Sequence, residues 1–266
     1  MGHLRRVGGA VVVIVLAVVT AGCGTRAAGP RAAPRPHHAA HRTKAAVSST
    51  PTTVATASAN PFSVPASTLV ATTNSDIPGY TLAGASTPSM TVPGSWYGYP
   101  SILPVITALP GWLEVRLAQR PNGSTIWVHQ SDVTISNTPY AIVVDLATMH
   151  LLVYDAGTQV FDFPAGVGAP DDPTPTGQYF MPMLYPSPGP GYGPFVLVTS
   201  DHSDTITDWE NSGDAIIGIH GPITSYDDSL IGTTGAAISH GCIRLHDADL
   251  AQLAGIPAGT PIDVVS

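Results

Sequence analysis

Short runs in which apolar and polar residues alternate are the main structural signal in the chain beyond residue 75. Over 113–117, Leu, Val and Leu alternate with Glu and Arg, which is the period-two pattern of a strand with one buried face. The sequence Pro-Asn-Gly-Ser at 121–124 predicts a hairpin turn, and the apolar residues of 126–130 predict the returning strand. We therefore expect a small β domain over 76–136.

The last half of the chain, residues 137–266, carries longer apolar runs that predict a second β-rich domain. Its expected strands cover 141–146, 151–154, 159–163 and 260–265. One short helix is expected over 247–254, with Leu250 and Leu253 facing inward. Asp247 is its expected N-cap. The predicted fold class is therefore mainly β, with a short C-terminal helix.

The N-terminus has the features of a secretory signal. Two arginines precede an apolar run over 7–19 that is short for a membrane span, and small residues then lead to Cys23. This arrangement resembles a bacterial lipoprotein cleavage site, in which the cysteine is lipidated, although Thr20 replaces the usual leucine. Ordinary secretion and an uncleaved membrane anchor are the alternatives for residues 1–23.

Residues 24–75 are rich in Ala, Pro, Thr and Ser and show no hydrophobic period, so we expect a disordered tether. A flexible chain of this length has an r.m.s. reach of about 40 Å. All 18 Asp and Glu residues lie after residue 45, whereas most of the Lys and Arg residues lie before it. The acidic part argues against a nucleic-acid partner. The basic stretch is either a contact for an anionic membrane surface or a solvated linker.

The candidate chemistry lies in the sequence Ser-His-Gly-Cys-Ile-Arg at 239–244, with His-Gly upstream at 220–221. A thiol is a strong nucleophile as its thiolate, and a nearby imidazole is the usual group that removes its proton. If Cys23 is lipidated, Cys242 has no disulfide partner in the chain, which favours a functional thiol. A buried structural cysteine and a disulfide between the two cysteines are the alternatives.

Together with Thr-Pro-Thr-Gly at 174–177, these sequences resemble the signature of the L,D-transpeptidases, the YkuD-type family of peptidoglycan cross-linking enzymes. The resemblance covers residues 139–266. It implies a YkuD-type β-sandwich catalytic domain that needs no metal or organic cofactor. It also implies acylation by carbapenems.

The resemblance assigns a role to each residue of the motif. Cys242 is the nucleophile, and His220 is the general base, oriented by the main-chain carbonyl of Gly221. His240 is expected to make a supporting hydrogen bond near the oxyanion, and Ser239 is expected to fix the turn. The N–H groups expected to face the oxyanion are those of Gly241 and Cys242.

Three further side chains are candidate substrate contacts. Arg244 lies two residues after the nucleophile and therefore on the same face of an extended segment. It either holds a carboxylate of the peptide stem or forms a salt bridge with a nearby acid such as Asp247 or Asp249. The upstream Pro- and Gly-rich loop, a candidate flap or a simple surface loop, carries Tyr185 and Tyr192.

The family reaction would transfer the acyl group of a tetrapeptide stem, with release of D-Ala, to the diaminopimelate amine of a second stem, giving a 3→3 cross-link. Water as acceptor would make the protein an L,D-carboxypeptidase, and a protein amine would make it an anchoring enzyme. The partners implied are peptidoglycan stem peptides and the membrane that holds the N-terminus. The expected location is extracytoplasmic, facing the cell wall.

Two other classes of protein are considered. A zinc hydrolase would use His202 with the histidines and cysteine of the site, but their spacing matches no common zinc motif. A non-catalytic wall-binding lipoprotein would bind glycan through residues 76–136, where 111–128 resembles a small Src-homology-three-like β-barrel.

Overall fold

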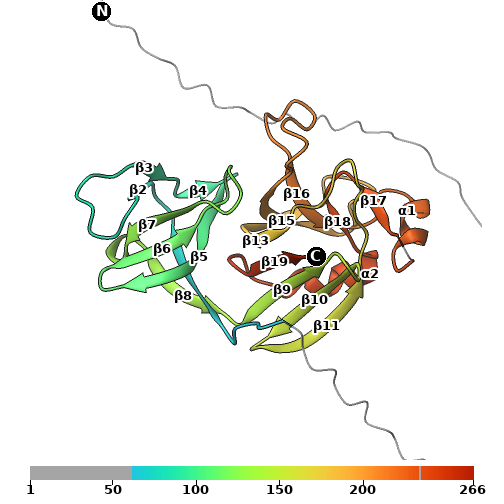
Figure 1. Cartoon of the computed structure of the whole chain (residues 1–266), viewed down its shortest axis with the longest axis horizontal. Helices are drawn as coiled ribbons and strands as arrows, with labels where there is room; N and C mark the ends of the chain where they lie inside the picture. Colours follow the sequence, from blue (N-terminus) through green and yellow to red (C-terminus); the bar gives the residue numbers. More distant parts are fainter. Residues whose placement is uncertain (1–61, 234) are drawn as a thin grey trace, which may run out of the picture. The chain divides into compact units, whose positions relative to one another are not determined.

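The structure is a computed structural model and describes residues 62–233 and 235–266 (Figure 1). The predicted signal segment, the lipidation candidate Cys23 and most of the predicted tether lie outside the described residues. The described part falls within one compact unit, Asn60–Ser266. Within the described ranges, no helix has the length and apolar character needed to cross a membrane.

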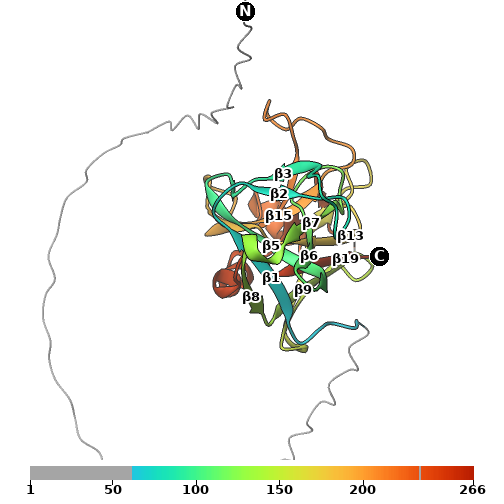
Figure 2. The same ribbon diagram turned by 90° about the vertical axis from the view of Figure 1, so that its left-hand side faces the viewer.

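The first part of this unit is a small antiparallel β domain. Its elements are β1 (Thr68–Thr73), β2 (Ile77–Gly79), β3 (Met90–Val92), β4 (Ser95–Trp96), β5 (Tyr99–Leu109), β6 (Trp112–Arg116), β7 (Thr125–His129), the 3₁₀ helix η1 (Gln130–Asp132) and β8 (Thr134–Thr138). One sheet has the order β7-β6-β5-β1-β8, with β4 paired to β5, and β2 pairs with β3 (Figure 2). The predicted hairpin is confirmed, since Leu113 pairs with Val128 and Val115 with Ile126. The likeness to a Src-homology-three barrel stays a prediction.

The predicted tether boundary at residue 75 is wrong for the described residues before it. β1 lies inside that segment and pairs with both β5 and β8, so it is an interior strand of the sheet. Phe62 and Val64 also pack against a buried cluster of the second domain. The physical reason is that Val70 and Ala71, only 3% and 0% exposed, gain burial from non-local pairing that local composition does not reveal.

The second part of the unit is a β-sandwich. Its strands are β9 (Tyr140–Asp145), β10 (His150–Asp155), β11 (Thr158–Pro164), β12 (Val167–Gly168), β13 (Gly177–Phe180), β14 (Met183–Pro186), β15 (Phe195–His202), β16 (Ile216–His220), β17 (Ala237–Ser239), β18 (Ile243–Arg244) and β19 (Pro261–Val265). The sheet β11-β10-β9-β19-β13 faces the sheet β14-β15-β16-β18, and β12 pairs with β17 (Figure 1). Apolar residues of both sheets meet in one core, so the predicted mainly β fold is confirmed.

Three short helical segments complete the second domain: α1 (Ser225–Leu230), α2 (Asp247–Ala251) and the 3₁₀ helix η2 (Gln252–Gly255). The predicted C-terminal helix is present, and Leu250 and Leu253 are buried as expected. The predicted N-cap is wrong by one residue. His246 occupies the cap and makes no side-chain cap hydrogen bond.

The two domains share buried contacts. Phe180 of β13 is fully buried in the core cluster of the small domain, beside residues such as Leu113 and Val115. Across the same boundary, Arg116 donates to Gln178 Oε1 at 3.1 Å. The small domain therefore packs on the sandwich instead of being joined to it by a linker alone.

Candidate active site

The pairing of β16 with β18 brings the candidate nucleophile and base together. The two strands are parallel, with Ile219 opposite Ile243 and His220 opposite Arg244. Ile219 and Ile243 are buried in the core, so the alternating residues project from the other face of the sheet. The same register puts Cys242 beside Gly218, whose N–H donates to the cysteine sulfur at 3.4 Å. Cys242 and His220 therefore share one face of the strand pair.

His220 is held by its own backbone neighbour. Its ring is 3% exposed, and Nδ1 lies 2.6 Å from the carbonyl oxygen of Gly221. A carbonyl oxygen only accepts hydrogen bonds, so Nδ1 carries the proton and Nε2 is left as the base. The ring of Tyr192 lies 4.9 Å from the His220 ring, and its carbonyl accepts from the Gly221 N–H at 3.0 Å.

Gly221 is required by a close approach. A Cβ at this position would fall 2.8 Å from the backbone nitrogen of Gly193 and would also collide with the carboxylate of Asp247. A larger residue would therefore displace the carbonyl that orients His220.

The turn before the cysteine is fixed by two hydroxyl groups. Ser239 Oγ accepts from the Gly241 N–H at 3.1 Å and donates to the Cys242 carbonyl at 2.5 Å. Gly241 has φ +110°, and its carbonyl accepts from the buried Thr174 hydroxyl at 2.7 Å. Thr174 also accepts from the Gly168 N–H at 2.9 Å. Sequence analysis noted the Thr-Pro-Thr-Gly segment but missed this contact with the cysteine turn.

The predicted use of Gly241 as an oxyanion donor is wrong in this structure. Its N–H is already bonded to Ser239 Oγ, because the turn directs it inward. Of the two donors predicted, the N–H of Cys242 remains as the candidate. The turn also leaves Cys242 partly exposed, and its thiol is free.

Burial shifts the pKa values of both groups toward their neutral forms. Desolvation lowers the pKa of His220 to about 4. The charge of Arg244 also lowers this pKa, whereas the hydrogen bond to Gly221 raises it. Desolvation also raises the pKa of the Cys242 thiol, although the Gly218 N–H and Arg244 oppose this. At neutral pH the site therefore holds a neutral thiol and a neutral imidazole, and the thiol loses its proton as it attacks.

This charge state predicts an unusual pH profile. The rate of acylation by a carbapenem should stay constant within about twofold from pH 5.5 to pH 8 and should fall only as His220 becomes protonated near pH 4. Alkylation of Cys242 by iodoacetamide should become faster only at pH values above the ordinary range of thiol pKa values. Stopped-flow measurements across pH test both expectations. A step in acylation near pH 6.5 would instead indicate a solvated imidazole or a preformed ion pair.

His240 does not lie where sequence analysis placed it. Its side chain is 63% exposed, and its contacts are with the ring of Trp209, 5.4 Å away, and with Asp172 Oδ2, 4.0 Å from Nε2. These contacts direct the imidazole along the surface. A hydrogen bond from His240 near the oxyanion stays a prediction.

Arg244 is paired within the protein. It is 8% exposed, and Nη1 lies 2.9 Å from Asp227 Oδ2 on α1. The predicted alternative, a salt bridge of Arg244 with an acid, is therefore confirmed, but the expected partners Asp247 and Asp249 are wrong. The capping box of α1, formed by Thr224 and Asp227, holds the partner carboxylate in place.

The two candidate tyrosines have different positions. Tyr192 lies against His220, and burial, reinforced by Cys242, raises the pKa of its hydroxyl. Tyr185 lies on the edge strand β14 opposite Val196, so β15 separates it from His220. Only Tyr192 is brought to the candidate site. The connection between β14 and β15 is the segment that carries it.

The residues of the zinc alternative are dispersed. His202 is buried and its Nδ1 lies 2.8 Å from Asp214 Oδ2, with burial lowering the pKa of the imidazole. Within residues 62–233 and 235–266, no group of three or more His, Cys, Asp or Glu side chains has an arrangement that could hold a metal ion.

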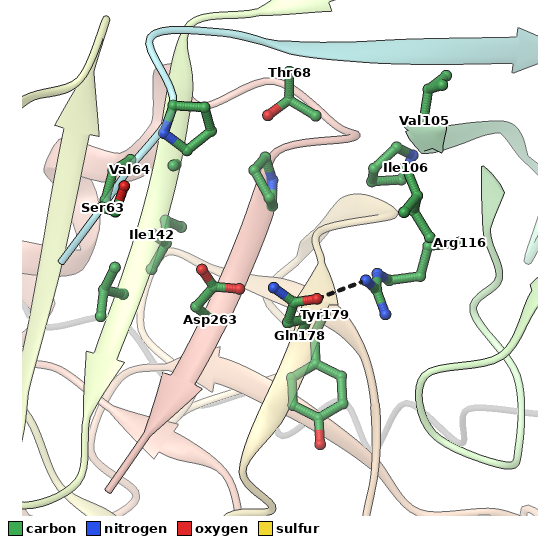
Figure 3. A pocket seen from close by; sticks show the side chains of 15 residues that line it. Ser63, Val64, Thr68, Val105, Ile106, Arg116, Ile142, Gln178, Tyr179 and Asp263 are labelled. Atoms are coloured by element: carbon green, nitrogen blue, oxygen red, sulfur yellow. Dashed lines mark hydrogen bonds between the residues drawn. The ribbon is translucent and has the colours of Figure 1, made fainter. Parts of the chain in front are cut away.

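Two cavities in the described residues do not include Cys242 or His220 among their lining residues. One, of about 240 Å³, lies between β5, β6, β13 and β19, where Arg116 donates to Gln178 beside Asp263 (Figure 3). The other, of about 440 Å³, is lined by residues of the 222–228 and 246–248 segments. It borders the candidate site through Asp247, which contacts Gly221.

The β-sandwich places a cysteine on the same strand face as a histidine whose Nδ1 is bonded to a carbonyl, which is an arrangement suited to nucleophilic catalysis. Residues 139–264 match the family model of the L,D-transpeptidase catalytic domain, YkuD. YkuD proteins of Bacillus licheniformis and Bacillus subtilis are 32% and 30% identical to it over 127 residues. That alignment covers 47% of this chain and 66% of each relative, slightly under two thirds of their length.

Solved structures of L,D-transpeptidases are also similar to the chain. A Mycobacterium smegmatis L,D-transpeptidase shares 19% identity with a TM-score of 0.39, over 60% of this chain and 80% of that one. L,D-transpeptidase 3 of Mycobacterium tuberculosis, solved with a faropenem-derived adduct, shares 14% identity with a TM-score of 0.38, over 62% and 91% of the two chains.

Proposed function

We propose that this protein is a peptidoglycan L,D-transpeptidase that forms 3→3 cross-links by cysteine acyl transfer. The observation that carries the proposal is the Cys242 thiol on the same strand face as His220, whose Nδ1 is bonded to the Gly221 carbonyl. The match of residues 139–264 to the YkuD family model supports the choice of substrate.

In the proposed reaction, Cys242 Sγ attacks the carbonyl of meso-diaminopimelate in a tetrapeptide stem while His220 Nε2 takes the thiol proton. The tetrahedral oxyanion is stabilised by the Cys242 N–H. The C–N bond to D-Ala then breaks, and His220 gives its proton to the leaving amine. The amine of a second stem attacks the thioester, returns the sulfur as a thiol and leaves an amide cross-link.

The surrounding residues have supporting roles in this proposal. Ser239 and Gly241 shape the cysteine turn, and Thr174 holds it through the Gly241 carbonyl. Tyr192 covers His220 and is the candidate substrate contact on the proposed flap. We place the protein outside the cytoplasm, held at the membrane through a lipidated Cys23 and facing the wall.

Intact-mass spectrometry with a purified disaccharide-tetrapeptide tests the proposal. The expected result is an acyl-enzyme heavier by the donor minus D-Ala, followed by a cross-linked dimer that carries the diaminopimelate amide. Release of disaccharide-tripeptide without dimer would favour the carboxypeptidase alternative, and transfer to an added protein would favour the anchoring alternative. Absence of any adduct with this donor, while meropenem still acylates the protein, would overturn the proposed substrate.

A further inference from the structure

An exposed tryptophan lies beside the proposed nucleophile. Trp209 belongs to the connection between β15 and β16 and is 42% exposed. Its ring centroid lies 5.4 Å from that of His240, with 47° between the planes. His240 is two residues before Cys242, so the aromatic surface begins close to the sulfur. Neither the proposed acyl transfer nor the core uses this ring.

The loop that carries Trp209 is built to hold it in place. Glu210 and Asn211 have φ +53° and +63°, and the Ser212 N–H donates to the Trp209 carbonyl at 3.0 Å. Two successive left-handed residues with this bond form a type I′ turn. The Trp209 N–H also donates to the Asp214 carbonyl at 2.9 Å. The ring is therefore presented by a closed hairpin, at a cost in backbone strain that is typical of functional loops.

The small β domain anchors both ends of this loop. Asn122 accepts from the His202 N–H at 2.9 Å and donates to the His202 carbonyl at 2.7 Å. Arg120 Nε lies 2.8 Å from Asp214 Oδ1 and a second guanidinium nitrogen donates to the Ile206 carbonyl at 3.1 Å. Asn122 thus holds the strand that precedes the Trp209 loop, and Arg120 holds the acid that follows it. Such pre-organisation is what a binding surface requires.

Polar groups suited to hydroxyls border the aromatic ring. Asp172 Oδ2 lies 4.0 Å from His240 Nε2, and Asp172 Oδ1 accepts from the Thr205 hydroxyl at 3.0 Å. An aromatic face is electron-rich and attracts the polarised C–H groups of a pyranose ring. Carboxylate oxygens accept from sugar hydroxyls. Because the Asp172 carboxylate repels the anionic residues of a stem peptide, the surface suits a neutral saccharide better than a peptide.

The spacing fits the sugar that carries the donor stem. In a tetrapeptide stem, three residues separate the sugar from the scissile bond, which is about 10 Å of extended chain. His240 and Cys242 are two residues apart across the cysteine turn, so the chain between them covers less than the about 7 Å of an extended segment. The Trp209 ring lies 5.4 Å beyond the His240 ring. The sugar of the donor can therefore reach the Trp209 ring when the carbonyl is at the sulfur.

We propose that Trp209, with His240 and Asp172, forms a saccharide subsite for the glycan unit of the donor. The proposal rests on the proposed function, and it predicts that the protein prefers a donor whose stem still carries its disaccharide. The preference should be about two- to tenfold in kcat/KM, the range expected of one aromatic contact.

The readout is the ratio of kcat/KM for disaccharide-tetrapeptide to that for free tetrapeptide. In Trp209→Ala the ratio should fall to about one, and Trp209→Phe should restore part of it. The ratio is used because an effect on both donors alike, such as an indirect effect through His240, cancels in it. Tyr97→Ala, which removes a 58% exposed aromatic ring on the β4–β5 turn, is the matched control and should keep the wild-type ratio. A wild-type ratio of about one, or an unchanged ratio in Trp209→Ala, overturns the subsite.

A binding measurement separates this proposal from the proposed function. NMR titration of the Cys242→Ala protein with the disaccharide alone should shift the Trp209 indole N–H resonance at millimolar sugar. Adding Trp209→Phe should weaken the binding. If neither donor is turned over but the titration gives this result, the reaction is wrong and the saccharide subsite stands. If the disaccharide does not bind, or binds equally well after Trp209→Ala, the subsite is wrong whatever the reaction.

Discussion

Cys242→Ala is expected to abolish turnover of the disaccharide-tetrapeptide and covalent labelling by meropenem together. Both reactions require attack by one sulfur atom, and removing a nucleophile from a coupled catalytic group lowers the rate by at least about four orders of magnitude. The variant should remain folded, because the sulfur receives one long hydrogen bond, 3.4 Å from the Gly218 nitrogen. Intact-mass spectrometry and thermal melting of the same sample report the two results.

Cys242→Ser is the matched control for this prediction. The hydroxyl occupies the position of the thiol and keeps the turn formed by Ser239 and Gly241, but it is a much weaker nucleophile at neutral pH. It should be folded and nearly inactive. A meropenem adduct on Cys242→Ala would show that another residue is the nucleophile. Unchanged cross-linking by Cys242→Ala in cells would favour the non-catalytic wall-binding alternative.

The parts of the fold that could be predicted are those whose buried positions follow a local pattern of apolar and polar residues. The β6–β7 hairpin combines strict alternation with a Pro-Asn-Gly-Ser turn, and its register is the one expected. β1 was not predicted, because its Thr-rich sequence resembles the preceding segment in composition. Its identity as a strand comes from pairing with β5 and β8, which lie far along the chain.

The residues of the candidate site also fall into those that short motifs predict and those that only the tertiary structure reveals. Cys242, His220 and Gly221 are marked by short sequence motifs, and the register of β16 and β18 brings them together. Thr174 and Asn122 act through contacts with residues 67 and 80 positions away, so only the tertiary structure reveals them. The partner of Arg244 was missed for a related reason, since sequence proximity suggested the acids of α2 when β18 faces α1 instead.

Removal of Arg244 is expected to cause the largest loss of stability among the substitutions considered. The Arg244 guanidinium is paired with Asp227 at 2.9 Å, with side-chain exposures of 10% and 18%. Breaking a buried pair from one side leaves the other charge without its partner, which costs about 3 kcal/mol. For a unit of about 200 residues, this lowers Tm by about 6–12 °C. Differential scanning calorimetry of Arg244→Ala and Asp227→Asn measures the loss.

Asp227→Asn is preferred to alanine because its side-chain oxygen can still accept from the Thr224 N–H in the capping box of α1. The double variant should be more stable than the sum of the two single losses predicts, by about 1–3 kcal/mol, since the second substitution removes a charge already left unpaired. Asp249→Ala is the control, because this expected partner does not contact Arg244 in the structure. It should show no coupling to Arg244→Ala.

The same variants decide between the two roles considered for Arg244. A guanidinium used to bind the carboxylate of a peptide stem would give a higher KM with an unchanged Tm, and Asp227 would show no coupling to it. The geometry argues for the opposite result, because the side chain is buried and already holds an acid of α1. α1 follows Gly221 by only four residues, so loosening this pair should also disturb the carbonyl that orients His220. Loss of stability should therefore come with a fall in kcat, not with a change in KM alone.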